Sequence, residues 1–325
     1  MSIVLGRGQC GAHITLLFTI DDSIEDPVFQ GSRGAGICLK DGVEAIAKGE
    51  KGSGEMIVRY KNGEYDSRMY QDVLSELVEE IPEIGDLDWE LDIIMSLPTS
   101  QGFGMSASGA VASSMAIQRA IGIPHEECVR RAFLVAHIVE RKRSSGLGDT
   151  TALSSGGVER RIAAGSPFSG SLLDHGPGVS QGWSIEIPIL ISWKEKTGRH
   201  TSSYIDSEDW RDKICQAGEL AMERIGQGEW DELRWQELIE ESLRFSSESG
   251  LEMDASRSEI IESVNKAIDS SGFTDSLSAL LCMLGESVVI VPKDPRWEED
   301  WIYKISEELE GNGLSSFSSR VGKLR

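Results

Sequence analysis

The feature that most constrains this chain is a glycine-rich loop between a predicted strand and a predicted helix. An apolar segment over residues 91–98 ends in a proline, glycines follow at positions 102 and 104, and small helix-forming residues then continue from Ala110 to Ile121. Glycines let backbone N–H groups turn toward an anion, and the first turn of a helix adds unpaired donors and the positive end of its dipole. The order therefore predicts a phosphate-binding site, although such loops also occur as plain turns.

The loop differs from three well-known glycine motifs. It is not a Rossmann Gly-x-Gly-x-x-Gly loop, and the chain contains no Walker sequence Gly-x-x-x-x-Gly-Lys-Ser/Thr. It also misses the nucleophile elbow Gly-x-Ser-x-Gly, because Gly104 and Ser106 are followed by Ser108 where that motif needs a glycine. A serine hydrolase is therefore a poor interpretation.

The charge of the chain argues against two classes of partner. Its 54 acidic and 32 basic residues give a net charge of −22, whereas nucleic acids and anionic membrane surfaces bind basic patches. The chain has no apolar run of membrane-spanning length and no apolar N-terminal stretch long enough for a signal peptide. The five cysteines are widely spaced and form no Cys-x-x-Cys pair, which is typical of reduced thiols. We expect a cytoplasmic protein that binds neither nucleic acid nor membrane.

The pattern of elements predicts an α+β protein of two domains. The first half is rich in strand signals, including two strands over 33–39 and 43–47 that are separated by a hairpin turn at Lys40-Asp41-Gly42. The second half is mostly helical. The Gly-, Ser- and Pro-rich segment Gly165–Gly182 is predicted to be a loop at the domain boundary, which gives domains of residues 1–182 and 183–325.

Two pairs of polar residues near the loop are candidates for phosphate or metal chemistry. Ser106 and Ser108 stand at the predicted helix start, where a serine serves either as an N-cap or as a hydroxyl ligand of magnesium or phosphate. His137 and Glu140 are three residues apart on the next predicted helix and therefore share a face. The pair is either surface decoration or, through the carboxylate, part of a magnesium site.

Three further residues could act on a substrate. Asp149 follows a glycine turn before a new helix, so it is either an N-cap or a carboxylate that orients a substrate hydroxyl or accepts its proton. Arg160 and Arg161 could each hold a substrate carboxylate in bidentate fashion, or could simply be solvated at a strand end.

Several of these segments together resemble a known family. The sequence from Pro98 to Ser108 resembles the second motif of the GHMP kinases, the superfamily of galactokinase, homoserine kinase, mevalonate kinase and phosphomevalonate kinase. Most of residues 9–165 resemble the archaeal pantoate kinases, a branch of that superfamily. The matching runs are Gly11–Phe18, Asp26-Pro27, Gly31–Gly36, Gly102–Ser106, Gly146–Asp149 and Gly156–Arg161.

The resemblance implies a fold and a reaction. The fold is the GHMP kinase fold, with an N-terminal domain like domain 2 of ribosomal protein S5 and a ferredoxin-like C-terminal domain. The reaction is the phosphorylation of (R)-pantoate to (R)-4-phosphopantoate with ATP and Mg²⁺, a step of coenzyme A biosynthesis. The family also suggests a homodimer.

The resemblance assigns roles to individual residues. Asp149 would be the catalytic carboxylate, and Ser106 and Glu140 would act in catalysis as magnesium ligands. Ser32, His137 and Arg161 would contact pantoate, with His13 and Arg160 as further candidates for substrate contacts. ATP would lie on the motif residues Pro98, Gly102, Phe103, Gly104, Met105, Ser106, Ala107 and Ser108.

Departures from the family pattern leave alternatives open. Gly11 stands where the family usually has proline, and Arg160 beside Arg161 makes the carboxylate ligand ambiguous. The third GHMP motif is reduced to Ser278–Glu286. A GHMP kinase for another small hydroxy acid or alcohol, such as homoserine or mevalonate, is one alternative. A sensor that binds nucleotide or metabolite without turnover is another.

Overall fold

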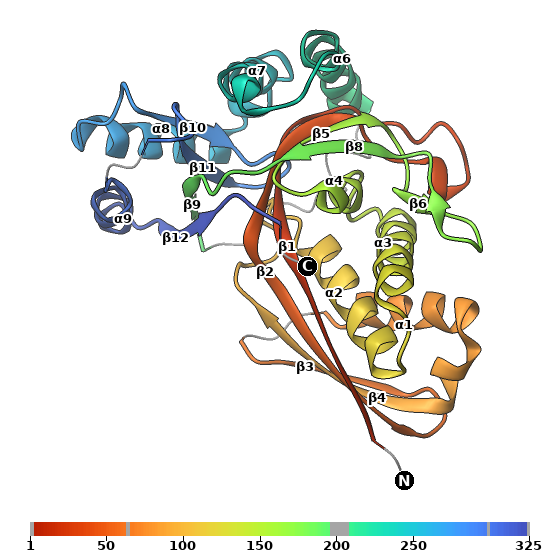
Figure 1. Ribbon diagram of the computed structural model, residues 1–325. Helices are drawn as coiled ribbons and strands as arrows, with labels where there is room; N and C mark the ends of the chain where they lie inside the picture. Colours follow the sequence, from red (N-terminus) through yellow and green to blue (C-terminus); the bar gives the residue numbers. More distant parts are fainter. Residues whose placement is uncertain (1–2, 63–65, 196–207, 298–299, 324–325) are drawn as a thin grey trace.

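We describe the fold from a computed structural model, which describes residues 3–62, 66–195, 208–297 and 300–323 (Figure 1). The strands are β1 Val4–Phe18, β2 Gly34–Lys51, β3 Met56–Tyr60, β4 Leu87–Met95, β5 Val158–Ala163, β6 Phe168–Ser169, β7 Asp174–His175, β8 Val179–Trp183, β9 Pro188–Trp193, β10 Leu277–Leu281, β11 Ser287–Pro292 and β12 Ser315–Arg320. The α-helices are α1 Arg68–Glu80, α2 Met105–Ala120, α3 His125–Lys142, α4 Asp149–Ser155, α6 Glu208–Ile225, α7 Trp235–Glu248, α8 Ala255–Ser270 and α9 Ile302–Gly311.

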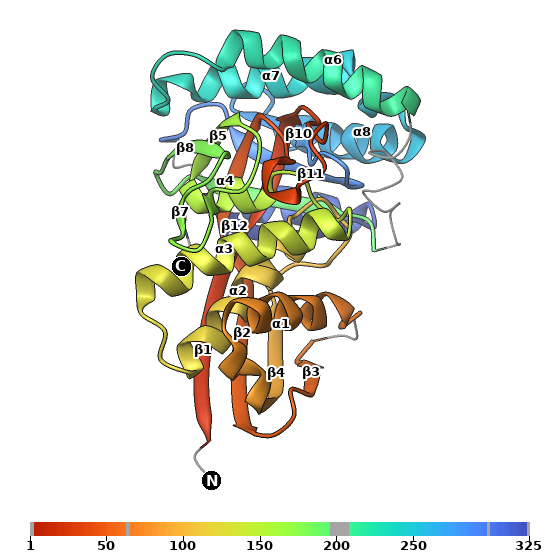
Figure 2. The ribbon, with the colours of Figure 1, turned by 90° about the vertical axis from the view of Figure 1, so that its right-hand side faces the viewer.

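A large mixed sheet forms the body of the first half. Its strand order is β3-β4-β2-β5-β8, and β1 pairs with the other side of β2. The long strands β1 and β2 run through the molecule, and α1, α2 and α3 lie together on one face of the sheet (Figures 1 and 2). The register of β1 on β2 shifts between Gly11 and His13 and again between Thr15 and Leu17. The segment His13–Thr15 therefore keeps regular pairing with β2, between two irregularities at Ala12 and Leu16 that locally redirect the strand.

Close packing of α2 on β1 explains the run of small residues in that helix. A Cβ atom placed on Gly8 would lie 2.0 Å from the carbonyl oxygen of Ala112, and one on Gly6 would lie 2.1 Å from that of Ala116. Ala112 and Ala116 are themselves fully buried. The helix backbone therefore rests directly on the strand, which fixes the position of the helix N-terminus.

A second, four-stranded sheet forms the core of the other half. Its order is β10-β11-β9-β12, all antiparallel, and the four residues Val288–Val291 of β11 are completely buried. Helices α6 and α7 lie at the end of the molecule opposite the chain's N-terminus (Figure 2). The chain leaves the first sheet at Trp183 and enters the second at Pro188. The division into domains at residues 182 and 183 stays a prediction that this passage supports.

Two sequence expectations about strands are wrong. Lys40, Asp41 and Gly42 form no hairpin turn, because β2 is one continuous strand. Cys38 pairs with His13 and Gly42 pairs with Gly11, so three residues of β2 lie opposite a single residue of β1. Residues 39–41 therefore form a bulge. The bulge meets the C-terminal part of the chain, where Leu39 bridges to Val321 and Ser319 donates a hydrogen bond of 2.7 Å to Asp41.

The segment Gly165–Gly182 is also not a plain loop. It contains the short pair β6–β7 and most of β8, and β8 adds to the first sheet beside β5. Helices predicted from apolar spacing over residues 69–81, 125–143, 208–226 and 256–271 correspond to α1, α3, α6 and α8 to within one residue at each end. Those predicted over 229–245 and 296–310 begin six residues before α7 and α9. Among the described residues, we find no helix with the length and apolar character needed to cross a membrane.

Candidate active site

A cavity of about 430 Å³ opens between the first sheet, the glycine loop and the turn after β10. Its walls include Ser32, the loop residues 102–106 with Thr99 and Ser100, the segment 143–149, Arg161, and Met283 with Leu284. The turn of residues 282–286 packs on the loop, because a Cβ atom on Gly285 would lie 2.1 Å from the carbonyl oxygen of Gln101. The reduced third motif therefore still closes this side of the cavity.

The glycine loop presents the start of α2 to the cavity, as the sequence predicted. Gly104 is the N-cap residue and has left-handed dihedral angles (φ 60°, ψ 25°), so neither Ser106 nor Ser108 is the N-cap that the alternative interpretation required. No side chain of the described residues caps this end of the helix, so its first N–H groups are open to a ligand. Residues 102–106 line the cavity, whereas Pro98, Ala107 and Ser108 are not among its lining residues. The Ser108 hydroxyl is buried and donates to the carbonyl oxygen of Gly11 (2.6 Å).

Ser106 and Glu140 fit a magnesium ion in their chemistry. The Ser106 hydroxyl lies at the cavity wall, 3.3 Å from the hydroxyl of Ser145. Glu140 is buried behind Gly146, and its Oε1 has no hydrogen-bond partner among the described residues. Burial, and after it the charge of Asp149, raises the pKa of Glu140 well above its usual range. A cation that prefers oxygen ligands would give Oε1 of Glu140 a partner and would stabilise the ionised carboxylate. The described residues hold no cluster of three or more His, Cys, Asp or Glu side chains for a metal.

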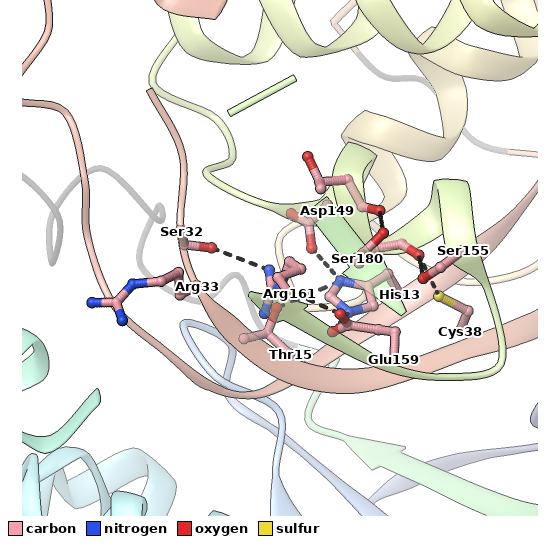
Figure 3. A network of polar contacts seen from close by, with 12 residues as sticks. His13, Thr15, Ser32, Arg33, Cys38, Asp149, Ser155, Glu159, Arg161 and Ser180 are labelled. Carbon is pink, nitrogen blue, oxygen red and sulfur yellow. Dashed lines mark hydrogen bonds and ion pairs between the residues drawn. The ribbon is translucent and has the colours of Figure 1, made fainter. Parts of the chain in front are cut away.

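Asp149 stands at the start of α4, where Gly148 is the N-cap, so the predicted N-cap role of Asp149 is wrong. Its carboxylate lines the cavity and is bonded from behind by His13, whose Nδ1 lies 2.6 Å from Oδ1 (Figure 3). Burial alone would raise the pKa of Asp149. The hydrogen bond and charge of His13, together with the charge of Arg161, outweigh this effect, so the pKa of Asp149 is lowered overall. The Asp149 carboxylate is therefore held ionised beside the cavity.

His13 has no contact with the cavity, contrary to the expected substrate contact. It is fully buried, and its Nε2 lies 3.0 Å from Oε1 of Glu159, which is also fully buried. Figure 3 shows the imidazole ring between the two carboxylates. Burial lowers the pKa of His13, but hydrogen bonds to Asp149 and then Glu159 offset this, so its pKa is raised overall.

Arg161, not Arg160, faces the cavity. The two are neighbours on β5, and neighbouring strand residues point to opposite faces. Arg161 donates from Nη1 to the hydroxyl of Ser32 (3.2 Å), and its Nε lies 3.4 Å from Oε2 of Glu159. Its Nη2 is buried without a hydrogen-bond partner in the described part of the chain. A buried guanidinium with a free N–H at a cavity is suited to a carboxylate.

Glycines leave the space that these side chains occupy. A Cβ atom on Gly148 would lie 2.2 Å from Nη1 of Arg161 and 2.3 Å from the Ser32 hydroxyl. On β2, a Cβ atom on Gly36 would lie 2.8 Å from Nε2 of His13, and one on Gly34 would lie 2.8 Å from Nη2 of Arg161. The site is therefore built on positions where any larger residue would displace a charged group.

Two expected substrate contacts lie elsewhere. Arg160 is buried and donates to the carbonyl oxygens of Ile225 (2.6 Å), Gln227 (3.0 Å) and Gly228 (2.9 Å), so it ties β5 to the end of α6. His137 is buried, and its ring nitrogens lie 3.1 Å from the hydroxyl of Thr150 and 3.0 Å from the carbonyl oxygen of Pro27. Burial lowers the pKa of His137 to about 4. Neither side chain lines the cavity, and only Nε of Arg160 is without a hydrogen-bond partner among the described residues. Their contact with a substrate stays a prediction of the sequence.

Sequence reasoning missed Glu159 and Thr15. Glu159 shares the face of Arg161 because it lies two residues earlier on β5, so the strand period was the signal that could have found it. Thr15 lines the cavity two residues after His13. The wall formed by Tyr60, Met69 and Tyr70 has no sequence signal, because β3 and α1 bring it together.

Comparisons with known proteins agree with this geometry. Residues 68–157 match the family model described as "GHMP kinases N terminal domain". A solved structure described as "Phosphotransferase related to CoA biosynthesis pathway" superimposes with a TM-score of 0.75 at 24% identity, over 99% of this chain and 97% of that one. The chain therefore has the GHMP kinase fold, as the sequence resemblance implied, and residues 68–157 are similar to the N-terminal domain of that family.

The chain is also similar to curated pantoate kinases. It is 33% identical to that of Thermococcus kodakarensis over 172 residues, which are 51% of this chain and 55% of the relative. It is 29% identical to that of Methanospirillum hungatei over 164 residues, which are 48% of this chain and 52% of the relative. The matches thus span about half the length of these relatives.

Proposed function

We propose that this protein is an ATP-dependent kinase that phosphorylates the hydroxyl on carbon 4 of (R)-pantoate, a step toward coenzyme A. The observation that carries the proposal is one cavity that combines the uncapped start of α2, the ionised carboxylate of Asp149 and the buried guanidinium of Arg161. These three groups suit, in order, a phosphate chain, an acceptor hydroxyl and a substrate carboxylate. Pantoate carries both the hydroxyl and the carboxylate, and the similarity to curated pantoate kinases supports it as the acceptor.

The nucleotide and its metal are part of the proposal. The phosphates of ATP would lie against the backbone of residues 102–106, where the helix dipole and free N–H groups favour negative charge. Ser106 and Glu140 would hold Mg²⁺, whose chemistry is to neutralise charge on the phosphates. The unpartnered Oε1 of Glu140 is the observation that supports this assignment.

The residues of the chain would act mainly by position and charge. Arg161, supported by Ser32, would bind the carboxylate of pantoate and so place its hydroxyl at Asp149. Because the pKa of Asp149 is lowered, this carboxylate is a weak base, and it would orient the hydroxyl and take its proton late in the transfer. Phosphoryl transfer needs little more from the protein, because its transition state is loose and is stabilised by positioning.

The alternatives differ in acceptor or in turnover. A GHMP kinase for homoserine or mevalonate would keep the loop and Asp149 but would use Arg161 differently. A sensor would bind nucleotide without transfer, yet the ionised Asp149 at the cavity and the unpartnered Glu140 behind Gly146 are groups that binding alone does not need. The cytoplasmic location and the homodimer stay predictions of the sequence.

The test is ADP release with ATP and magnesium against pantoate, homoserine, mevalonate, shikimate and no acceptor. We expect turnover with pantoate. We also expect Asp149→Asn to lower kcat by about 10²–10⁴-fold while ATP affinity is kept, because the carboxylate acts on the acceptor and not on the nucleotide. Turnover with another acceptor alone would reject pantoate, and tight ATP binding without any turnover would favour the sensor.

A further inference from the structure

A chain of charged groups runs behind the cavity from Asp149 to Arg161 and ends at the hydroxyl of Ser32. Asp149 contacts His13 (2.6 Å), His13 contacts Glu159 (3.0 Å), Glu159 contacts Arg161 (3.4 Å) and Arg161 contacts Ser32 (3.2 Å). The side chains of His13 and Glu159 are fully buried, and that of Arg161 is 1% exposed. Figure 3 shows the members of this chain side by side. The proposed function uses the two ends of the chain, but it gives no role to its middle.

The contacts of His13 define its charge state. Each ring nitrogen lies within hydrogen-bond distance of a carboxylate oxygen, and an ionised carboxylate can only accept. A neutral imidazole has one N–H, so one of the two contacts would then set a nitrogen lone pair against an oxygen lone pair. An imidazolium donates to both. The raised pKa of His13 agrees with this assignment.

Glu159 lies on the side of the His13 imidazole ring opposite Asp149. Its Oε1 accepts from His13 and its Oε2 faces Arg161, so one buried carboxylate is shared by two cations. Such a charge is costly to bury unless it is paired, and these two partners provide the pairing. Removing the charge of Glu159 would therefore leave Arg161 without the carboxylate that it contacts, and His13 with Asp149 as its one contacting carboxylate among the described residues.

We propose that His13 and Glu159 are positioning residues, which join the carboxylate of Asp149 and the guanidinium of Arg161 into one rigid unit. This inference rests on the proposed function and deepens it. The unit comes from β1, α4 and β5, and it holds the partner of the acceptor hydroxyl at a set separation from the partner of the substrate carboxylate. It would select short hydroxy acids over acceptors whose hydroxyl and carboxylate are farther apart.

The proposal predicts the pH dependence of activity. The groups that face His13 and Asp149 are Glu159 and Arg161 of β5, Glu140 of α3, and the Cys38 thiol of β2, which pairs with His13 in the sheet. Of these, His13 and Arg161 are the cations that favour ionised Asp149. Loss of the His13 cation therefore raises the pKa of Asp149, and the acid limb of kcat against pH moves to higher pH.

The first test is kinetic. We expect His13→Gln, which keeps one donor but no charge, to lower kcat by roughly 10²-fold, since small displacements of reacting groups have effects of that size. The acid limb should move to higher pH, and ATP affinity should be kept. If kcat falls with no shift of the acid limb, the role of His13 is structural only and the proposal is overturned.

The second test needs no substrate. Proton–nitrogen correlation spectra of the imidazole groups, recorded over a pH range, report the charge of each of the five histidines. His13 should show both nitrogens protonated to higher pH in the wild type than in Glu159→Gln, whereas His137 should be neutral in both down to a pH of about 4. A neutral His13, or an equal midpoint in the two proteins, would overturn the proposal.

The two tests separate the inference from the proposed function. If pantoate is not an acceptor but another compound is, the acid limb is measured with that compound. If no acceptor is phosphorylated, the proposed function fails, and the spectra alone decide whether the buried chain of charges exists.

Discussion

Arg160 and Arg161 are adjacent on β5 and equally buried, yet strand geometry gives them different environments. Arg160 donates to three backbone carbonyl groups at the end of α6 and lies over the ring of Trp230, with its guanidinium carbon 5.0 Å from the ring centroid. Arg161 faces the cavity with an unpartnered Nη2. At the scale of the residue, the same side chain makes structural contacts in one position and is the proposed substrate ligand in the next.

This contrast gives a matched pair of variants. Arg161→Gln should raise the KM for pantoate by about 10–100-fold and leave that for ATP unchanged, because a hydrogen bond to a charged group contributes about 1.5–3 kcal/mol. Arg160→Gln should lower the midpoint of thermal unfolding and leave the KM for pantoate near the wild-type value. Steady-state kinetics and thermal unfolding of the two variants check this. The reverse result would identify Arg160 as the carboxylate ligand.

At the scale of the element, α2 is positioned by its backbone contact with β1. Gly8→Ala should therefore destabilise the protein by about 1–3 kcal/mol, the usual cost of inserting a methyl group where nothing can yield. The neighbouring atom is a backbone oxygen, 2.0 Å from the new Cβ atom. The loop before α2 should shift with the helix, so ATP affinity should fall as well.

Gly311→Ala is the control for this variant. Gly311 ends α9, and an added Cβ atom there meets nothing within 4 Å. Because alanine favours the helix over glycine, this variant should be as stable as the wild type or slightly more stable. The midpoint of urea unfolding measures both variants. Equal midpoints for Gly8→Ala and the wild type would contradict the close packing of α2 on β1.

The elements also show which parts of the fold a sequence can predict. Helix α3 was predicted to within one residue because its apolar residues repeat at the helical period, whereas α2 was predicted from an uninterrupted run of small helix-forming residues. Strand β2 was divided in two because Asp41-Gly42 is a common turn sequence. Residues 39–41 instead form a bulge that contacts the C-terminal part of the chain near Val321. This contact has no signal in the local sequence.

For the candidate site, the sequence predicted those residues that belong to a recognisable local motif. The glycine loop, Ser106, Glu140, Asp149 and Arg161 carry their own local patterns, and the fold brings them around one region. The buried chain through His13 and Glu159 was not predicted, because it joins residues 146 positions apart. The substrate contact of His137 stays a prediction, because its spacing from Glu140 shows a shared face but not what that face contacts.

At the scale of the whole molecule, the cavity depends on both halves of the chain. Met283 and Leu284, from the turn after β10, complete a wall that otherwise belongs to the first sheet and its helices. The backbone N–H of Met283 donates to the carbonyl oxygen of Thr15 (3.0 Å), so the turn is fixed directly to β1. The second half thus shapes the cavity, although its own sequence carries no strong motif.

The central claim is that this cavity transfers the γ-phosphate of ATP to the hydroxyl on carbon 4 of pantoate. The most direct measurement is a phosphorus NMR spectrum of the product formed from ATP, magnesium and (R)-pantoate. We expect a phosphate monoester on carbon 4, formed in amounts equal to the ADP released. Inorganic phosphate in place of the ester, an acyl phosphate on the carboxylate, or an ester on carbon 2 would contradict it.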